Sequence, residues 1–64
     1  MTAEEFNAKY PVGTSCRYFP LKGDGYSMQT RTRSEAWELG SGHVVVAIDN
    51  RSGGVSVGHL IMEA

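Results

Sequence analysis

The alternation of apolar and polar residues along this chain predicts short β-strands joined by glycine-rich turns. Residues 44–48 form an apolar, β-branched run, residues 50–54 are polar and rich in glycine, and residues 55–57 begin a second run. β-Branched residues suit a pleated sheet, and Asn and Gly tolerate the positive φ of a tight turn. The stretch 42–58 is therefore predicted to be a β-hairpin, against which further strands must pack because two strands alone are marginally stable.

The amino-terminal residues predict one or two turns of helix. Thr2 and Glu5 have the spacing of a capping box, in which each residue hydrogen-bonds the other's backbone. Phe6 and Tyr10 are spaced to share one helical face. Pro11 ends this segment, because the residue before a proline is pushed out of the helical region.

Residues 14–19 alternate and predict the first strand. Cys16 and Tyr18 fall on one side of it, which we expect to face the core. Pro20 interrupts the strand, and the segment 21–28 is polar and glycine-spaced, as in an exposed loop. The first strand is thus followed by a long excursion before the next one.

The next strand begins with a clean alternation over residues 29–33. Both threonines fall on one face, and Arg31 and Arg33 fall on the other. Such a pattern is typical of a half-exposed strand. We therefore expect the two arginines to project together from one side.

The segment 34–39 does not continue this alternation. An unbroken strand would place Trp37 and Leu39 on the arginine face. Either a bulge near Ser34 shifts the register, or a helical turn starts there and ends at Gly40. We favour the bulged strand, because so short a helical run is marginal without packing. Whether Trp37 lies in the core or on the surface stays open.

Together these patterns predict five short strands. One long loop follows the first strand, and a tight turn at 59–60 precedes a closing strand at 61–63. Small closed β-barrels have this organisation, because closure removes exposed edges. The order resembles the SH3-like barrel. We therefore predict an all-β fold, a small five-stranded SH3-like barrel over residues 12–64, preceded by a short N-terminal helical segment over residues 1–11.

Three sequence motifs give a more specific resemblance to known proteins than the order of strands does. They are YPVGT at 10–14, TRTRSEAWELG at 30–40, and RSGGV at 51–55 followed by HL at 59–60. Together they resemble a family of small uncharacterised proteins met in bacteriophage and prophage genomes. The resemblance implies a phage or mobile-element origin, and it carries no catalytic or ligand-binding residue onto this chain.

The length and the net charge of the chain argue against several classes of function. A chain of 64 residues has one core and buries only about 60% of the surface that its unfolded form exposes. Six basic and seven acidic residues give a net charge of -1, which argues against a general nucleic-acid coat or a basic membrane-surface protein. The first residues lack the pattern of a signal peptide, and no apolar run reaches membrane-spanning length. We expect a cytoplasmic protein without a membrane partner.

Few residues carry catalytic or metal-binding chemistry. His43, His59 and Cys16 lack the close pairwise spacing of a zinc site, and one cysteine closes no internal disulfide. Asp24 and Asp49 are isolated acids in turns, and neither glycine-rich loop has the features of a phosphate loop. We therefore expect no metal, no cofactor and no enzyme activity.

The sequence favours binding through the protein surface over catalysis or metal binding. Arg31 and Arg33 lie near three aromatic residues, Tyr18, Tyr26 and Trp37, and these five are the candidate binding residues. A protein partner is the leading hypothesis, because small barrels bind partners through aromatic grooves or open strand edges. Nucleic acid is the alternative, since basic residues interleaved with aromatic ones hold single strands. A third hypothesis, drawn from the phage resemblance, is counter-defence against a host immune protein or its nucleotide signal.

Two features suggest where a partner would bind. The loop 21–28 is expected to form one wall of a groove beside Trp37. Val45 and Ala47 lie on the opposite face of their strand from the other apolar residues of that run, so the strand is apolar on both sides. Either the N-terminal helix or a second copy in a homodimer is expected to cover this second face.

Overall fold

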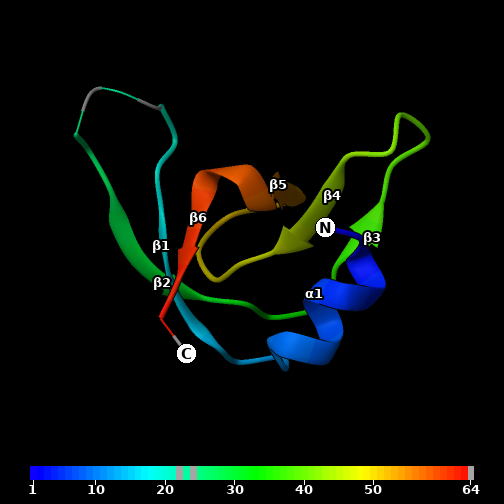
Figure 1. Ribbon diagram of the computed structural model, residues 1–64. Helices are drawn as coiled ribbons and strands as arrows, with labels where there is room; N and C mark the ends of the chain where they lie inside the picture. Colours follow the sequence, from blue (N-terminus) through cyan, green and yellow to red (C-terminus); the bar gives the residue numbers. More distant parts are fainter. Residues whose placement is uncertain (22, 24, 64) are drawn as a thin grey trace.

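The computed structural model describes residues 1–21, 23 and 25–63 and contains two small antiparallel sheets with one short α-helix (Figure 1). In chain order the elements are α1 (Ala3–Lys9), β1 (Ser15–Tyr18), β2 (Met28–Arg31), β3 (Trp37–Glu38), β4 (Val44–Ala47), β5 (Gly54–Ser56), the 3-10 helix η1 (Val57–His59) and β6 (Leu60–Met62). The first sheet has the order β2-β1-β6 and the second has the order β3-β4-β5.

The mainly-β character predicted from the sequence is confirmed. The strands form two three-stranded sheets rather than one closed barrel. A turn precedes the last strand as predicted, but it is the 3-10 helix η1 at Val57–His59 rather than at 59–60, and Leu60 already belongs to β6. Lys22, Asp24 and Ala64 lie outside the described residues, and so does the predicted turn at Asp24. Within the described residues, no helix has both the length and the apolar character to cross a membrane.

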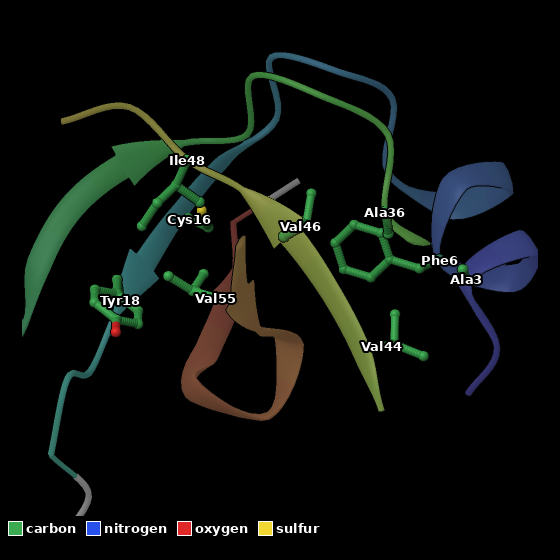
Figure 2. Close-up of a cluster of buried hydrophobic side chains, with 9 residues drawn as sticks. All are labelled: Ala3, Phe6, Cys16, Tyr18, Ala36, Val44, Val46, Ile48 and Val55. Atoms are coloured by element: carbon green, nitrogen blue, oxygen red, sulfur yellow. The ribbon is translucent and has the colours of Figure 1, made fainter. Parts of the chain in front are cut away.

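Strand β1 has the predicted alternation. Cys16 is fully buried and Tyr18 is 7% exposed, whereas Ser15 and Arg17 are exposed. The strand lies between β2 and β6, with Cys16 opposite both Thr30 and the last residue of β6. Its inward side chains therefore belong to the core (Figure 2).

The predicted bulge separates β2 from β3. Thr32 pairs with Ile48, and Trp37 pairs with Val45. The chain thus advances five residues from 32 to 37, while the opposing strand advances three, from 48 to 45, so two extra residues are accommodated here. Because two is an even number, the phase is kept, and Trp37 and Leu39 stay exposed as Arg31 and Arg33 are; the expected shift of register off the arginine face is wrong. The alternative of a helical turn is wrong. At the bulge the hydroxyl of Ser34 accepts a hydrogen bond from the Ala47 N–H (3.3 Å), in place of a backbone carbonyl.

Helix α1 packs on the core rather than on the outer side of the second sheet. The predicted capping box is present, since Glu5 N–H donates to Thr2 Oγ1 (3.1 Å) and Thr2 N–H donates to Glu5 Oε1 (2.8 Å). Phe6 is 2% exposed and lies with Val44 and Val46 (Figure 2). The helix therefore covers one end of the core.

A single amide side chain attaches α1 to the bulged segment. Asn7 Nδ2 donates to the Ala36 carbonyl (3.1 Å), and Asn7 Oδ1 accepts from the Ala36 N–H (2.7 Å). Both backbone groups of a buried residue are thus satisfied without a neighbouring strand.

Substitution Asn7→Ala is expected to lower the free energy of unfolding by about 1–2 kcal/mol, because it leaves two partly buried backbone groups without their partner. Urea denaturation followed by circular dichroism measures this loss. Asn7→Asp keeps the acceptor for the Ala36 N–H but sets a carboxylate oxygen against the Ala36 carbonyl, so it should also lose stability. Equal stability of all three proteins would contradict this role.

The capping box is expected to weaken in acid. The backbone N–H and the hydroxyl of Thr2 hold the pKa of the Glu5 carboxyl below its ordinary value of 4.5. A lowered folded-state pKa means that the carboxylate stabilises the fold above pH 4.5 and that this contribution is lost as the pH falls through the folded-state pKa. The stability difference between the wild type and Glu5→Ala, measured by thermal unfolding, should therefore shrink below pH 4.5.

Candidate functional site

Strand β4 is buried on both faces, which creates an unusual surface on the second sheet. Val44 and Val46 belong to the core, whereas Val45 and Ala47 point to the outer side, and each of these two is only 7% exposed. The N-terminal helix was one predicted cover for the outer side, and this is wrong because the helix packs on the core. The side chain that covers Val45 is that of Trp37, its partner across β3 and β4.

The indole of Trp37 lies over the backbone of Gly54. A Cβ atom built at Gly54 would be 2.8 Å from Trp37 Cη2, 2.9 Å from Trp37 Cζ2 and 3.2 Å from Val45 Cβ. These distances are shorter than van der Waals contact, so only glycine leaves room for the ring. The indole therefore spans from β3 across β4 to β5.

Trp37 also remains a surface residue. It is 42% exposed, and Leu39, which is two positions further along the same face, is 46% exposed. The question left open by the sequence is thus answered, because one side of the indole covers the sheet while the rest meets solvent. We refer to Trp37, Leu39, Val45, Ala47 and Gly54 as the Trp37 face.

The predicted pair of arginines is exposed, and both side chains have intramolecular partners. Arg31 Nε lies 3.4 Å from Asp49 Oδ2. Arg33 Nε donates to the Ile48 carbonyl (2.8 Å), and Arg33 Nη2 donates to the Arg51 carbonyl (2.9 Å). Arg33 therefore ties the bulged segment to the turn between β4 and β5.

The other two arginines are held in the same way. Arg17 Nε lies 3.7 Å from Glu63 Oε2, and Arg17 Nη1 donates to Ser27 Oγ (3.1 Å). The guanidinium of Arg51 lies 5.0 Å from the centre of the Tyr18 ring, with Nη2 3.5 Å from the Tyr18 hydroxyl. Every arginine of the chain thus interacts with another part of the molecule.

The candidate aromatic residues do not gather at one place. Tyr18 is buried in the core, so its ring is not a platform on which a ligand can stack. Tyr26 is 59% exposed in the loop between β1 and β2. Figure 1 shows the described part of this loop and β3 on opposite sides of the molecule, so these described residues do not form the predicted groove with Trp37.

That loop instead borders a different groove, which the sequence pattern does not predict. The groove has a volume of about 220 Å³ and is lined by Phe19, Gly23, Gly58, His59, Leu60 and Ile61. Two hydrogen bonds join its walls, from the Phe19 N–H to the His59 carbonyl (2.9 Å) and between His59 Nδ1 and the Phe19 carbonyl (2.8 Å). These two residues are 40 positions apart, so no local pattern in the sequence indicates their contact.

The titratable residues that were candidates for chemistry are separated or buried. Burial, and to a lesser extent the carboxylate of Glu63, raises the pKa of the Cys16 thiol, which disfavours the thiolate needed for nucleophilic attack. His43 Nδ1 is hydrogen-bonded to Ser41 Oγ (3.0 Å) on the surface. Across residues 1–21, 23 and 25–63, no three His, Cys, Asp or Glu side chains form a cluster that suits a metal ion.

Substitution Gly54→Ala is expected to displace the indole of Trp37 and to destabilise the fold by about 1–3 kcal/mol, because the new methyl group overlaps the ring. Since Trp37 is the only tryptophan, its fluorescence emission should shift to longer wavelength as the ring becomes more exposed. Gly40→Ala is the matched control, because nothing lies within 4 Å of a Cβ there. An unchanged emission spectrum in Gly54→Ala would contradict the packing of the ring on Gly54.

Comparisons with known proteins found no relative of this chain. No protein-family model matches the chain, and neither a curated protein nor a solved structure matches it. The candidate function therefore depends on the chemistry of the surface, and the feature that distinguishes this surface is the Trp37 face.

Proposed function

We propose that this chain is a small, non-enzymatic protein-interaction module that binds its partner through the Trp37 face. The observation that carries the proposal is the position of Trp37, whose indole is fixed on Gly54 and yet 42% exposed. Tryptophan is enriched among the residues that contribute most to protein binding, because a rigid aromatic ring buries a large area at little entropic cost. The adjoining Leu39 extends this apolar surface.

The arginine side chains already bind groups of the same molecule, which favours a protein partner over nucleic acid. Binding a strand through Arg31 and Arg33 would require phosphates to compete with Asp49 and with two backbone carbonyls. The net charge of -1 provides no general attraction for a polyanion. Nucleic acid is the second hypothesis, and treatment with nuclease distinguishes the two.

The proposal includes a fold type and a biological setting. The SH3-like barrel is supported by the long loop after β1, by the bulged segment that leads from the first sheet to the second, and by the 3-10 helix before β6. The three sequence motifs support a phage or mobile-element origin, and action in the cytoplasm is a further part of the proposal. Counter-defence is one form of this function, in which the bound protein belongs to a host immune system.

Affinity capture from bacterial lysate tests the proposal. The tagged wild type is expected to retain a protein partner after nuclease treatment, and Leu39→Glu should reduce the captured amount about tenfold, since it places a charge within an apolar interface. Leu21→Glu is the matched control, because Leu21 is 67% exposed and lies in the loop after β1. Circular dichroism verifies that both variants are folded.

Two outcomes would contradict the proposal. Loss of the captured material after nuclease treatment would favour nucleic acid, whose affinity must also fall steeply with salt. Equal capture by the wild type and by both leucine variants would assign binding to another surface, such as the groove lined by Phe19 and Ile61.

A further inference from the structure

We propose that the groove between Phe19 and Ile61 is a ligand site for a planar aromatic group with two fused rings and one N–H donor, and that His59 Nε2 accepts the hydrogen bond from this donor. The inference goes beyond the proposed function, because the groove and the Trp37 face have no residue in common. Three features support it, namely the volume of the groove, its apolar walls and its single hydrogen-bonding side chain.

The volume of the groove suits two fused rings. The groove has about 220 Å³, which is roughly 1.5 times the volume of an apolar cavity of about 150 Å³ that binds benzene. Benzene has six ring atoms, so a ligand that fills the groove to the same extent has about nine. Indole, a six-membered ring fused to a five-membered one, has this size.

The walls of the groove are apolar and are joined through the backbone. Phe19 and Ile61 line the groove, and neither belongs to the core cluster. Ile61 is 57% exposed although it lies in β6, which pairs with β1. The two hydrogen bonds between Phe19 and His59 hold the walls together, so the groove is formed before a ligand binds, as is usual for ligand sites. A flat aromatic ring would therefore cover apolar surface that the fold leaves exposed.

His59 gives the groove one hydrogen-bond acceptor. Of the described residues that line the groove, only His59 has a polar side chain. A carbonyl oxygen only accepts hydrogen bonds, so in the neutral ring the proton is on Nδ1, which donates to the Phe19 carbonyl. Nε2 then has a free lone pair, and no donor within the described part of the chain hydrogen-bonds it. A ligand with one N–H satisfies this nitrogen, whereas a ligand with acceptors alone does not.

Titration of the 15N-labelled chain with indole, followed by two-dimensional NMR at pH 7.5, tests the site. The amide signals of Gly58, Leu60 and Ile61 should shift with a dissociation constant of about 0.1–1 mM, as expected for a ligand of this size. The side-chain N–H signal of Trp37 should stay in place, because Trp37 lies outside the groove. The compound 1-methylindole has the same rings without the donor and should bind about fivefold more weakly, which is the effect of one hydrogen bond.

Two variants separate the hydrogen bond from the apolar walls. His59→Phe keeps an aromatic ring and removes the acceptor, so the preference for indole over 1-methylindole should be lost. Ile61→Ala shortens one wall at an exposed position and should weaken both compounds about threefold while the preference is retained. His43→Phe is the matched control, because His43 is exposed outside the groove and its exchange should change neither dissociation constant.

A tryptophan side chain of another protein and a free compound both provide this chemistry, and N-acetyltryptophanamide distinguishes them. It carries the same rings on a peptide backbone. Binding at least as tight as that of indole would support the site and assign it to a side chain. Binding weaker than that of indole would support the site and assign it to a free compound.

Two results would overturn the inference. One is the absence of shifts at Gly58, Leu60 and Ile61 up to about 10 mM indole, which is about tenfold above the expected dissociation constant. The other is a preference for indole over 1-methylindole that is the same in the wild type and in folded His59→Phe, because the donor then does not bind His59.

Discussion

Burial of β4 on both faces is the constraint on which the rest of this small structure depends. Val44 and Val46 need cover from the core side, and Val45 and Ala47 need cover from the outside. Among the described residues, α1 covers the first side and the indole of Trp37 lies over Val45 on the second. The bulge before β3 puts Trp37 opposite Val45, and Gly54 gives its ring room.

Side chains replace backbone partners where the short strands end. An asparagine amide satisfies both groups of Ala36, a serine hydroxyl accepts from the Ala47 N–H, and Arg33 donates to two carbonyls. Buried backbone groups without partners are costly, and a sheet of two- to four-residue strands has many ends. Polar side chains that resemble binding residues in the sequence thus contribute to the fold.

This use of polar side chains also limits what the surface can bind. The arginines are held by a carboxylate, by carbonyls or by an aromatic ring, which reduces the number of donors available to a phosphate backbone. One exposed apolar surface is the indole of Trp37, which packs on Gly54, beside Leu39. This surface is the one to which we assign the proposed apolar protein contact.

Local features were determined by the sequence alone, because they depend on residues close together in the chain. These are the capping box at Thr2 and the inward side of β1 marked by Cys16, whereas near Ser34 the sequence left a bulge and a helical turn as alternatives. Only the tertiary structure decided the role of Trp37, the groove beside Phe19 and the partners of Arg33, because each depends on contacts between distant segments. Alternation predicts which side of a strand a residue occupies, but it does not predict which distant residue covers that side.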